Sequence, residues 1–253
     1  MNDNTLSGRT ALVTGGSRGI GRAICVRLAQ AGIKVAINYR SNQAAAEETA
    51  QRVAEAGSSA YTVRANVASR QEVDAMVEEV GQHLGPIDLL VNNAGIFEFL
   101  PHDELTPEVW QTTLDTNLTA AYNTIWAVKD GMIERGFGRI VNMSSIGGVR
   151  GRPNSIAYSV TKAGIIMLTK SLAEAVAPHN LRVNCVAPGL TDTEMPHSVA
   201  TPEVIEELIE ATPLKRIGQP EDMAKVVYFL LSEDADFITG QTIIASGGRV
   251  LLP

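Results

Sequence analysis

Tyr158 and Lys162 have the types and the spacing of an acid–base pair. The residues around them are predicted to form a helix capped by Asn154 or Ser155. Residues four apart lie on one face of a helix, with Cβ atoms about 5–6 Å apart. A nearby ammonium favours the phenolate and lowers the tyrosine pKa from its ordinary value of about 10. The pair could therefore exchange protons near neutral pH, although most such pairs on helices are simply surface packing.

A glycine-rich turn near the N-terminus has the context of a phosphate site. Residues 14–21 read TGGSRGIG, between a predicted buried strand over 9–14 and a predicted helix that ends before Gly32. Glycines let a pyrophosphate approach the backbone closely, and the first turn of the helix offers free N–H groups. The plain alternative is an ordinary connection between strand and helix.

The end of the second predicted strand, over residues 33–39, indicates which dinucleotide would bind. An NAD site usually has an acidic residue there that holds the ribose 2′-hydroxyl, and this strand runs instead into Tyr39 and Arg40. Arg40, together with Arg18 of the glycine turn, could hold a 2′-phosphate, since guanidinium pairs well with phosphate oxygens. The sequence therefore favours NADP(H) over NAD(H), the alternative being that Arg40 is a solvated strand end.

Helices and strands alternate along the rest of the chain. Further strands are predicted over 60–65, 87–91, 139–143, 181–186 and 241–245, and helices over 43–56, 70–84, 107–134, 154–177 and 220–231. This alternation predicts an α/β fold: a single Rossmann-type, doubly wound parallel sheet of about seven strands with helices on both faces. Ligands of such sheets bind at the carboxyl ends of the strands, where Arg40, Asn66 and residues 92–95 fall.

Three segments depart from this regular pattern. Asn117 stands in the middle of the helix over 107–134, where it either bonds a neighbouring carbonyl or opens the helix at a functional point. Residues 190–213 are irregular around a short acidic helix over 203–210 and are expected to form a substrate lid. Residues 1–7 are a polar lead-in to one domain that spans 1–253.

The composition excludes several classes of protein. The 253 residues carry a net charge of −7 and no basic run, which argues against nucleic acid as a partner, and no apolar run is long enough to span a membrane. The N-terminus lacks the features of a signal peptide, and Cys25 and Cys185 are expected to be reduced core residues of a cytoplasmic protein. The four histidines are scattered, so no metal site is expected.

Taken together, these motifs resemble the short-chain dehydrogenase/reductase family over residues 7–248. The resemblance rests on residues 14–21, 92–95, Asn117, Ser145, Tyr158 with Lys162, Pro188 with Gly189, and 236–242 with 247–248. It implies an enzyme in which Tyr158 donates a proton to a substrate carbonyl oxygen that also accepts a hydrogen bond from Ser145. Ser145 is implied rather than Ser144, because the family serine lies thirteen residues before the tyrosine. Lys162 is implied to lower the tyrosine pKa and hold the nicotinamide ribose, and Asn117 to position a water.

The same resemblance implies which residues contact the cofactor and the substrate. The cofactor set is Gly15, Ser17, Arg18, Gly19, Ile20, Gly21, Tyr39, Arg40, Asn66, Val67, Asn93, Ala94, Gly95, Tyr158, Lys162, Pro188, Gly189, Thr191 and Thr193. The substrate set is Phe97, Ile146, Val149, Arg150 and Met195. Asp often stands at position 66 in this family, and Asn is expected to serve the adenine as well.

Within the family, the chain looks most like the 3-oxoacyl-[acyl-carrier-protein] reductases of fatty acid biosynthesis. That implies NADPH-dependent reduction of the 3-oxo group of an acyl thioester, on acyl carrier protein or CoA. Arg135, Arg139, Arg150 and Arg152 are candidates for docking an acidic carrier protein, while Gly136 and His179 stand where such reductases would carry arginine.

Three questions of function and assembly stay open at the level of the sequence. Arg150 and Arg152 could instead bind a small acidic substrate or be solvated loop charges. The alternative functions are a sugar or alcohol dehydrogenase or another ketone reductase of the same family, and a cofactor-binding protein without catalysis. Apolar residues on the helices over 107–134 and 154–177 indicate a homotetramer or homodimer, the alternative being that they belong to the ordinary core.

Overall fold

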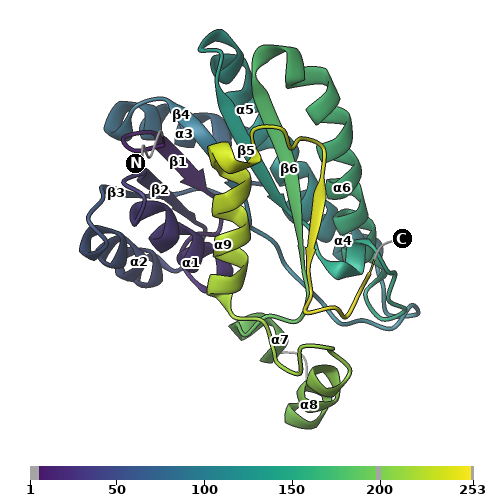
Figure 1. The fold of residues 1–253 in the computed structure, drawn as a ribbon. Helices are drawn as coiled ribbons and strands as arrows, with labels where there is room; N and C mark the ends of the chain where they lie inside the picture. The colour runs from purple at the N-terminus through teal and green to yellow at the C-terminus, as the bar shows by residue number, and fades with distance from the viewer. Residues whose placement is uncertain (1–5, 198–200, 252–253) are drawn as a thin grey trace.

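A parallel sheet of seven strands organises the chain. The structure, a computed structural model, describes residues 6–197 and 201–251 (Figure 1). The strands lie in the order β3-β2-β1-β4-β5-β6-β7, and every neighbouring pair is parallel. Their bounds are β1 Thr10–Val13, β2 Lys34–Tyr39, β3 Ala60–Arg64, β4 Ile87–Asn92, β5 Gly138–Met143, β6 Leu181–Pro188 and β7 Thr242–Ala245. The predicted doubly wound sheet is thus confirmed.

Helices cover both faces of the sheet because successive strand residues point to opposite sides. Ala11 and Val13 of β1 pack into the cluster formed with α1, α2 and α9, whereas Leu12 between them packs with α3, α5 and α6. The helices are α1 Gly19–Ala29, α2 Gln43–Glu55, α3 Arg70–Leu84, α4 Pro107–Leu114, α5 Ala120–Glu134, α6 Ile156–Val176, α7 Glu194–His197, α8 Pro202–Glu210 and α9 Pro220–Leu231. Figure 1 shows α1, α2 and α9 together on one side.

The chain reverses its direction of winding between β1 and β4. From β1 it proceeds outward to β2 and β3, and then returns to build β4, β5, β6 and β7 on the other side. In open parallel sheets, the crevice at such a switch point, outside the carboxyl ends of the strands, receives the ligand. The glycine turn follows β1 and residues 93–95 follow β4, so both border this crevice.

The helix predicted over 107–134 is interrupted at the residue that the sequence singled out. Asp115–Thr119 form a single π-helical turn between α4 and α5, and Asn117 is buried within it. Of the two alternatives for Asn117, the structure shows the opening of the helix. Isolated π turns inside α-helices frequently mark functional sites.

Two local predictions were wrong. Ser155 occupies the position before α6, but its side chain makes no capping hydrogen bond. Leu6 belongs to the predicted polar lead-in, yet it is buried in the core beside α1 and β2, since its side chain is apolar. Residues 1–5 of that lead-in lie outside the described residues.

The described parts of the segment 190–213, residues 190–197 and 201–213, extend from the carboxyl edge of the sheet as an arm (Figure 1). They contain the predicted acidic helix, α8, and in addition the short α7, which the sequence analysis did not anticipate. None of the α8 side chains is buried. Within 6–197 and 201–251, no helix has the length and apolarity needed to span a membrane.

Candidate active site

The glycine turn is tied directly to the end of β4. The Thr14 hydroxyl accepts hydrogen bonds from the backbone N–H groups of Asn93 and Ala94, each at 3.0 Å. The Asn93 side-chain amide in turn donates to the carbonyl oxygens of Thr14 and Gly15, each at 3.1 Å. Asn93, predicted to line the cofactor, therefore also holds the two halves of the crevice together.

The turn can take this shape only with glycine at key positions. Gly15 and Gly19 have φ angles of +61° and +53°, a region that L-residues with side chains rarely adopt. A Cβ at Gly21 would collide with the Gly15 carbonyl oxygen, and one at Gly19 would lie 3.2 Å from the Thr193 methyl group. The backbone N–H groups that open α1 are thus exposed to a closely approaching ligand.

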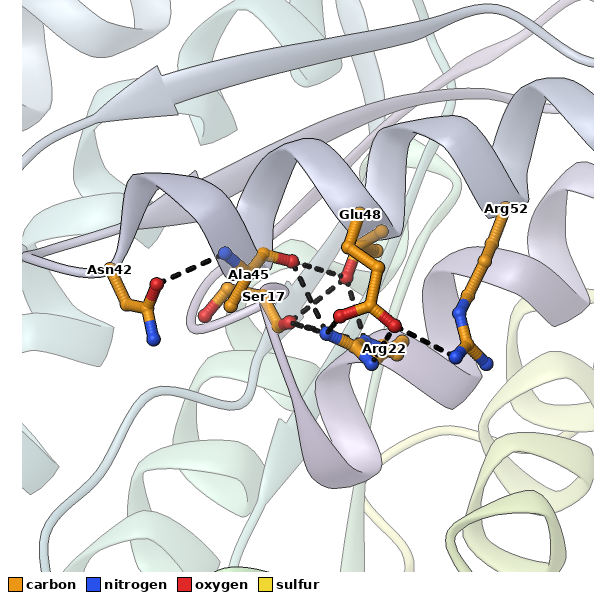
Figure 2. A network of polar contacts seen from close by, with 7 residues as sticks. Ser17, Arg22, Asn42, Ala45, Glu48 and Arg52 are labelled. Carbon is orange, nitrogen blue, oxygen red and sulfur yellow. Dashed lines mark hydrogen bonds and ion pairs between the residues drawn. The ribbon is translucent and has the colours of Figure 1, made fainter.

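Arg22 of α1 and Thr49 of α2 hold the turn, a role that the sequence analysis missed. The Arg22 guanidinium donates to the Ser17 carbonyl oxygen at 3.0 and 3.2 Å, and the Thr49 hydroxyl donates to the same oxygen at 2.9 Å. Figure 2 shows Arg22 also paired with Glu48, which bonds Arg52 as well. Hydrogen bonds from Arg52 and then Arg22 lower the Glu48 pKa. The one feature of the sequence that could have indicated this role was the basic residue Arg22 beside the apolar residues of the predicted helix.

Asn38 is a second residue that sequence reasoning missed. It is buried at the end of β2, where its Oδ1 accepts from the Gly15 N–H at 3.3 Å and its amide donates to the Ala65 carbonyl at 3.1 Å. It thereby joins the ends of β1, β2 and β3 beneath the glycine turn. A polar amide inside an otherwise apolar strand was the signal that could have identified it.

Guanidinium groups gather where β2 and β3 end. Arg40 is exposed just beyond β2, and its carbonyl oxygen accepts from the Arg64 guanidinium at 3.2 Å. Arg18, exposed on the glycine turn, is ion-paired with Glu194 of α7. Tyr39 is almost fully buried, so its side chain is part of the core beside the turn rather than an open contact surface.

The remaining predicted cofactor residues line the same edge. Asn66 follows β3, and its Oδ1 accepts from the Ala68 N–H at 3.2 Å; Val67 beside it is buried. At the end of β6, the Gly189 N–H donates to the Ala245 carbonyl at 2.9 Å, and the Thr191 hydroxyl donates to the Gly189 carbonyl at 3.2 Å. Since Thr193 lies against Gly19, residues after β6 reach back to the glycine turn. Gly16 and Ile20 complete the turn.

The two serines after β5 have different partners. The Ser144 hydroxyl is buried and donates to the Lys162 carbonyl oxygen at 2.7 Å, so it fixes α6 against the sheet. The Ser145 hydroxyl accepts from the Gly147 N–H at 3.0 Å and hydrogen-bonds the Tyr158 side chain. The geometry thus sets Ser145, rather than Ser144, beside the tyrosine.

Lys162 and Asn117 both lie close to Gly95, near Tyr158. The Lys162 ammonium is buried and donates to the Met143 carbonyl oxygen at 2.9 Å. Asn117 exchanges two hydrogen bonds with the backbone of Ile96, at 2.8 and 2.9 Å. A Cβ added to Gly95 would lie 3.1 Å from Asn117 Oδ1 and 3.5 Å from Lys162 Nζ, which shows how closely the strand end approaches both groups.

The electrostatics of the pair differ from the sequence expectation. Burial raises the pKa of Tyr158, and this effect exceeds the lowering by the Ser145 hydrogen bond and by Arg152. Burial also lowers the pKa of Lys162 to about 8. The expected lowering of the tyrosine pKa by the lysine was wrong for this structure. The Lys162 Nζ lies 5.6 Å from the tyrosine ring centroid and binds a carbonyl, so desolvation dominates both groups.

The predicted substrate residues divide into two groups. Phe97 stands edge-on to Tyr158, with ring centroids 4.9 Å apart, and Ile146 and Val149 belong to the short 3₁₀ turn and its end directly after Ser145. Arg150 is exposed beyond that turn, and Met195 is 40% exposed on α7. Phe97 therefore borders the tyrosine and Ile146 and Val149 follow Ser145, while Arg150 and Met195 are exposed.

Two of the proposed docking arginines were placed wrongly. Arg139 is the second residue of β5 and Arg135 ends α5, so both lie at the opposite edge of the sheet from Tyr158. Arg139 is buried and pairs with Asp236 at 2.9 Å, and Arg135 binds Asp88 and the Ile87 carbonyl oxygen. Burial lowers the pKa of Arg139. Within one chain they stabilise the base of the fold, away from the mouth of the site.

Comparison with known proteins agrees with this arrangement. Residues 15–249 match the family model described as enoyl-(acyl carrier protein) reductase. The chain is 46% identical over 241 residues to an acetoacetyl-CoA reductase of Rhizobium meliloti (strain 1021), covering 95% of this chain and 98% of that one. It is 40% identical over 243 residues to the 3-oxoacyl-[acyl-carrier-protein] reductase FabG of Staphylococcus epidermidis, covering 96% and 99%.

Solved structures are similar in the same way. A 3-oxoacyl-[acyl-carrier protein] reductase from Brucella melitensis superimposes with a TM-score of 0.91 at 36% identity, covering 98% of this chain and 94% of that one. An NAD⁺-bound xylitol dehydrogenase superimposes with a TM-score of 0.89 at 34% identity, covering 96% and 99%. The sheet order, the glycine turn and these matches lead to one conclusion: the chain belongs to the short-chain dehydrogenase/reductase family of nicotinamide-dependent oxidoreductases.

Proposed function

We propose that this enzyme uses NADPH to reduce the 3-oxo group of an acyl thioester. The observation that carries the proposal is the convergence of Ser145, Tyr158, Lys162 and Asn117 at the carboxyl edge of the sheet, next to the glycine turn. Relatives that are 40–46% identical over nearly the whole chain are an acetoacetyl-CoA reductase and a 3-oxoacyl-[acyl-carrier-protein] reductase.

The residues of the site would divide the reaction between them. A nicotinamide held in the crevice would supply the hydride for the carbonyl carbon. Tyr158 donates its phenolic proton to the carbonyl oxygen, so that a ketone, a hydride and a proton give an alcohol. Ser145 donates a hydrogen bond to the same oxygen, where negative charge develops. Lys162, with its pKa near 8, and Asn117 behind it would return a proton to the phenolate.

The cradle for the cofactor is supported by the glycine positions. A Cβ at Gly15 would lie 3.0 Å from the Ala94 backbone and one at Gly21 would lie 2.2 Å from the Gly15 carbonyl oxygen, so glycine is needed for the tight turn. This supports a pyrophosphate at the free N–H groups of the first turn of α1. The predicted cofactor set, from Gly15 to Thr193, lines this crevice and its two ends. Arm residues 190–213, which reach the glycine turn through Thr193 and Glu194, would close over both ligands as a lid.

The choice of NADPH rests on charge. No acidic residue follows β2, and Arg40 and Arg64 stand together at the adenosine end, where a 2′-phosphate would lie. Arg18 is also near, although Glu194 competes for it. Arg40 and Arg64 at the ends of β2 and β3, with no acidic residue directly after β2, favour the phosphorylated dinucleotide.

A sugar or alcohol dehydrogenase is the second candidate. The structural similarity to a xylitol dehydrogenase, with a TM-score of 0.89, favours it. A cofactor-binding protein without catalysis is disfavoured, because all four catalytic side chains are present and grouped.

Location and assembly follow from surface and core features. Cys25 and Cys185 are buried free thiols, which fits a reducing cytoplasm. Exposed apolar side chains on α5 and α6, including Tyr122, Val160 and Met167, fit pairing with further copies as a homodimer or homotetramer.

An absorbance assay that follows the dinucleotide directly tests the proposal. Purified enzyme is given NADPH or NADH with acetoacetyl-CoA, and separately NAD⁺ or NADP⁺ with xylitol and other polyols. Faster consumption of NADPH with acetoacetyl-CoA than of any other pair is the expected result. Turnover of polyols with NAD⁺, and none of acetoacetyl-CoA, would establish the second candidate instead.

A further inference from the structure

Ser155 carries a buried hydroxyl that the fold does not use. The residue is only 4% exposed, and its Oγ has no hydrogen-bond partner among the described residues. It stands directly before α6, where a serine normally accepts a hydrogen bond from the first helical turn, but it makes no such bond. A buried hydroxyl without a partner has lost its hydrogen bonds to water and gained none, so this position destabilises the free protein.

The space that Ser155 borders adjoins the catalytic tyrosine. A cavity is lined by Ser155 and Tyr158 together with mostly apolar side chains, namely Leu100, Leu105, Val109, Ile156 and Ala157, and by Glu98 and Thr113. The Thr113 hydroxyl already donates to the Val109 carbonyl at 2.8 Å. Among the lining hydroxyl groups of the described chain, Ser155 is thus the one that is buried without a partner.

A backbone hydrogen bond joins two of the segments that line this cavity. The Leu100 N–H donates to the Asn154 carbonyl at 2.9 Å, which holds the loop after β4 over the start of α6. Ser155 lies directly before α6 and three residues before Tyr158, and both residues line this cavity. The N-terminus of α6 adds free N–H groups and partial positive charge, which favour a ligand oxygen there.

We propose that the Ser155 hydroxyl donates a hydrogen bond to the thioester carbonyl oxygen of a 3-oxoacyl thioester whose 3-oxo group is held by Tyr158 and Ser145. The inference rests on the proposed function. In such a substrate, one methylene carbon separates the two carbonyl groups, so a donor one helical turn before Tyr158 can reach the second oxygen. A simple ketone would leave Ser155 unpaired, and the site therefore selects a 3-oxoacyl thioester over a monofunctional ketone.

The test compares Ser155→Ala with a matched control on the same helix. Ser159 lies one turn further on, and its Oγ is also buried without a partner, but it does not border the cavity. Ser155→Ala should lower kcat/KM for acetoacetyl-CoA about tenfold, which corresponds to the loss of one hydrogen bond of about 1.4 kcal/mol. Ser159→Ala should leave it within twofold of wild type, and Ser155→Thr, which keeps the hydroxyl, should restore most of the loss.

Thermal unfolding of the same variants separates substrate binding from a structural role. Removing an unsatisfied hydroxyl should leave the Tm of Ser155→Ala equal to or above that of wild type, whereas removal of a true cap would lower it. Two results would overturn the assignment of Ser155, provided that the wild-type enzyme turns over acetoacetyl-CoA. One is a kcat/KM of Ser155→Ala within twofold of wild type, and the other is a lowered Tm of this variant that accounts for its lost activity. Absence of acetoacetyl-CoA turnover in the wild-type enzyme would instead overturn the proposed function.

Discussion

Burial sets the protonation of Tyr158 and Lys162 in opposite directions. The raised tyrosine pKa keeps the phenol protonated at neutral pH, which suits a group that donates a proton during reduction. The lowered lysine pKa, about 8, lets Lys162 take up and release a proton in the working range of the enzyme. In the proposed mechanism, the pair acts through its shared desolvated surroundings at least as much as through direct attraction.

Replacing Tyr158 with Phe removes the proton donor and keeps the ring that Phe97 contacts edge-on. Turnover of acetoacetyl-CoA should fall by at least 100-fold, the range typical of a positioned acid. NADPH binding, followed by fluorescence titration, should remain. A loss of less than tenfold, about 1.4 kcal/mol of barrier, would show that another group supplies the proton.

Lys162 should give the enzyme a stability that rises with pH. Its folded pKa of about 8 lies below the unfolded value of about 10.4, so the unfolded chain binds more protons between these pH values. Stability against urea should therefore increase from pH 8 to pH 10 relative to Lys162→Met, by roughly 2–3 kcal/mol. The comparison with Lys162→Met removes the opposite contributions of Tyr158 and the cysteines. Parallel pH curves for both proteins would contradict the burial of a titrating lysine.

Arg40 is expected to decide the choice of dinucleotide. Arg40→Asp places a carboxylate where the 2′-phosphate would lie, so KM for NADPH should rise by at least tenfold while that for NADH changes little. Lys225→Asp, at an exposed position on α9, is the charge-matched control. Equal effects of Arg40→Asp on the two dinucleotides would place the 2′-phosphate elsewhere.

At the scale of the elements, the 3₁₀ turn Ile146–Gly148 packs directly against α6, and this packing brings Ser145 to Tyr158. A Cβ at Gly148 would lie 2.5 Å from the Lys162 carbonyl carbon, and one at Gly147 would lie 3.4 Å from the tyrosine ring. The turn and the helix therefore approach at backbone contact. The π turn at Asp115–Thr119 plays a similar part from the other side by bringing Asn117 to Ile96.

Gly148→Ala tests this close approach. The added methyl group has to push the turn away from α6, which should destabilise the protein by about 1–3 kcal/mol and lower kcat because Ser145 moves with the turn. Gly151→Ala is the matched control, since nothing lies within 4 Å of its Cβ position. Denaturant unfolding and kinetics of both variants provide the measurement. Equal stability of the two variants would mean that the turn can shift freely.

At the scale of the whole molecule, α5 and α6 leave apolar side chains exposed outside the core. Tyr122, Val160 and Met167 are 43%, 44% and 59% exposed, on the two helices that cover the same face of the sheet. Isolated exposed apolar residues are common, but three on neighbouring helices fit a surface that another copy covers.

We propose that this surface pairs with another copy of the chain, so Met167→Glu should give a smaller mass in solution than wild type, because a carboxylate buried between subunits has no partner. Light scattering after size-exclusion chromatography measures the mass in solution. Gln51→Glu, an exposed position on α2 at the other face of the sheet, should leave the mass unchanged. An unchanged mass for Met167→Glu would exclude this face from the subunit interface.

The sequence alone determined the features that depend on local pattern. Strand and helix periods and the glycine turn predicted the doubly wound sheet, which the structure contains. The weak helix former Asn117 left two alternatives, one of which was the opening that the structure contains within the helix over 107–134. The spacing of Tyr158 and Lys162 predicted a shared helix face. Backbone propensity and side-chain periodicity act over a few residues, so they can be read along the chain.

Only the tertiary structure decided what surrounds each group. It reversed the expected direction of the Tyr158 pKa, moved Arg135 and Arg139 to the far edge, and showed that the Ser155 hydroxyl lacks a partner. It also revealed the support that Asn38 gives to the glycine turn. Desolvation and hydrogen-bond satisfaction depend on atoms from segments far apart in the chain, and those neighbours exist only once the sheet has formed.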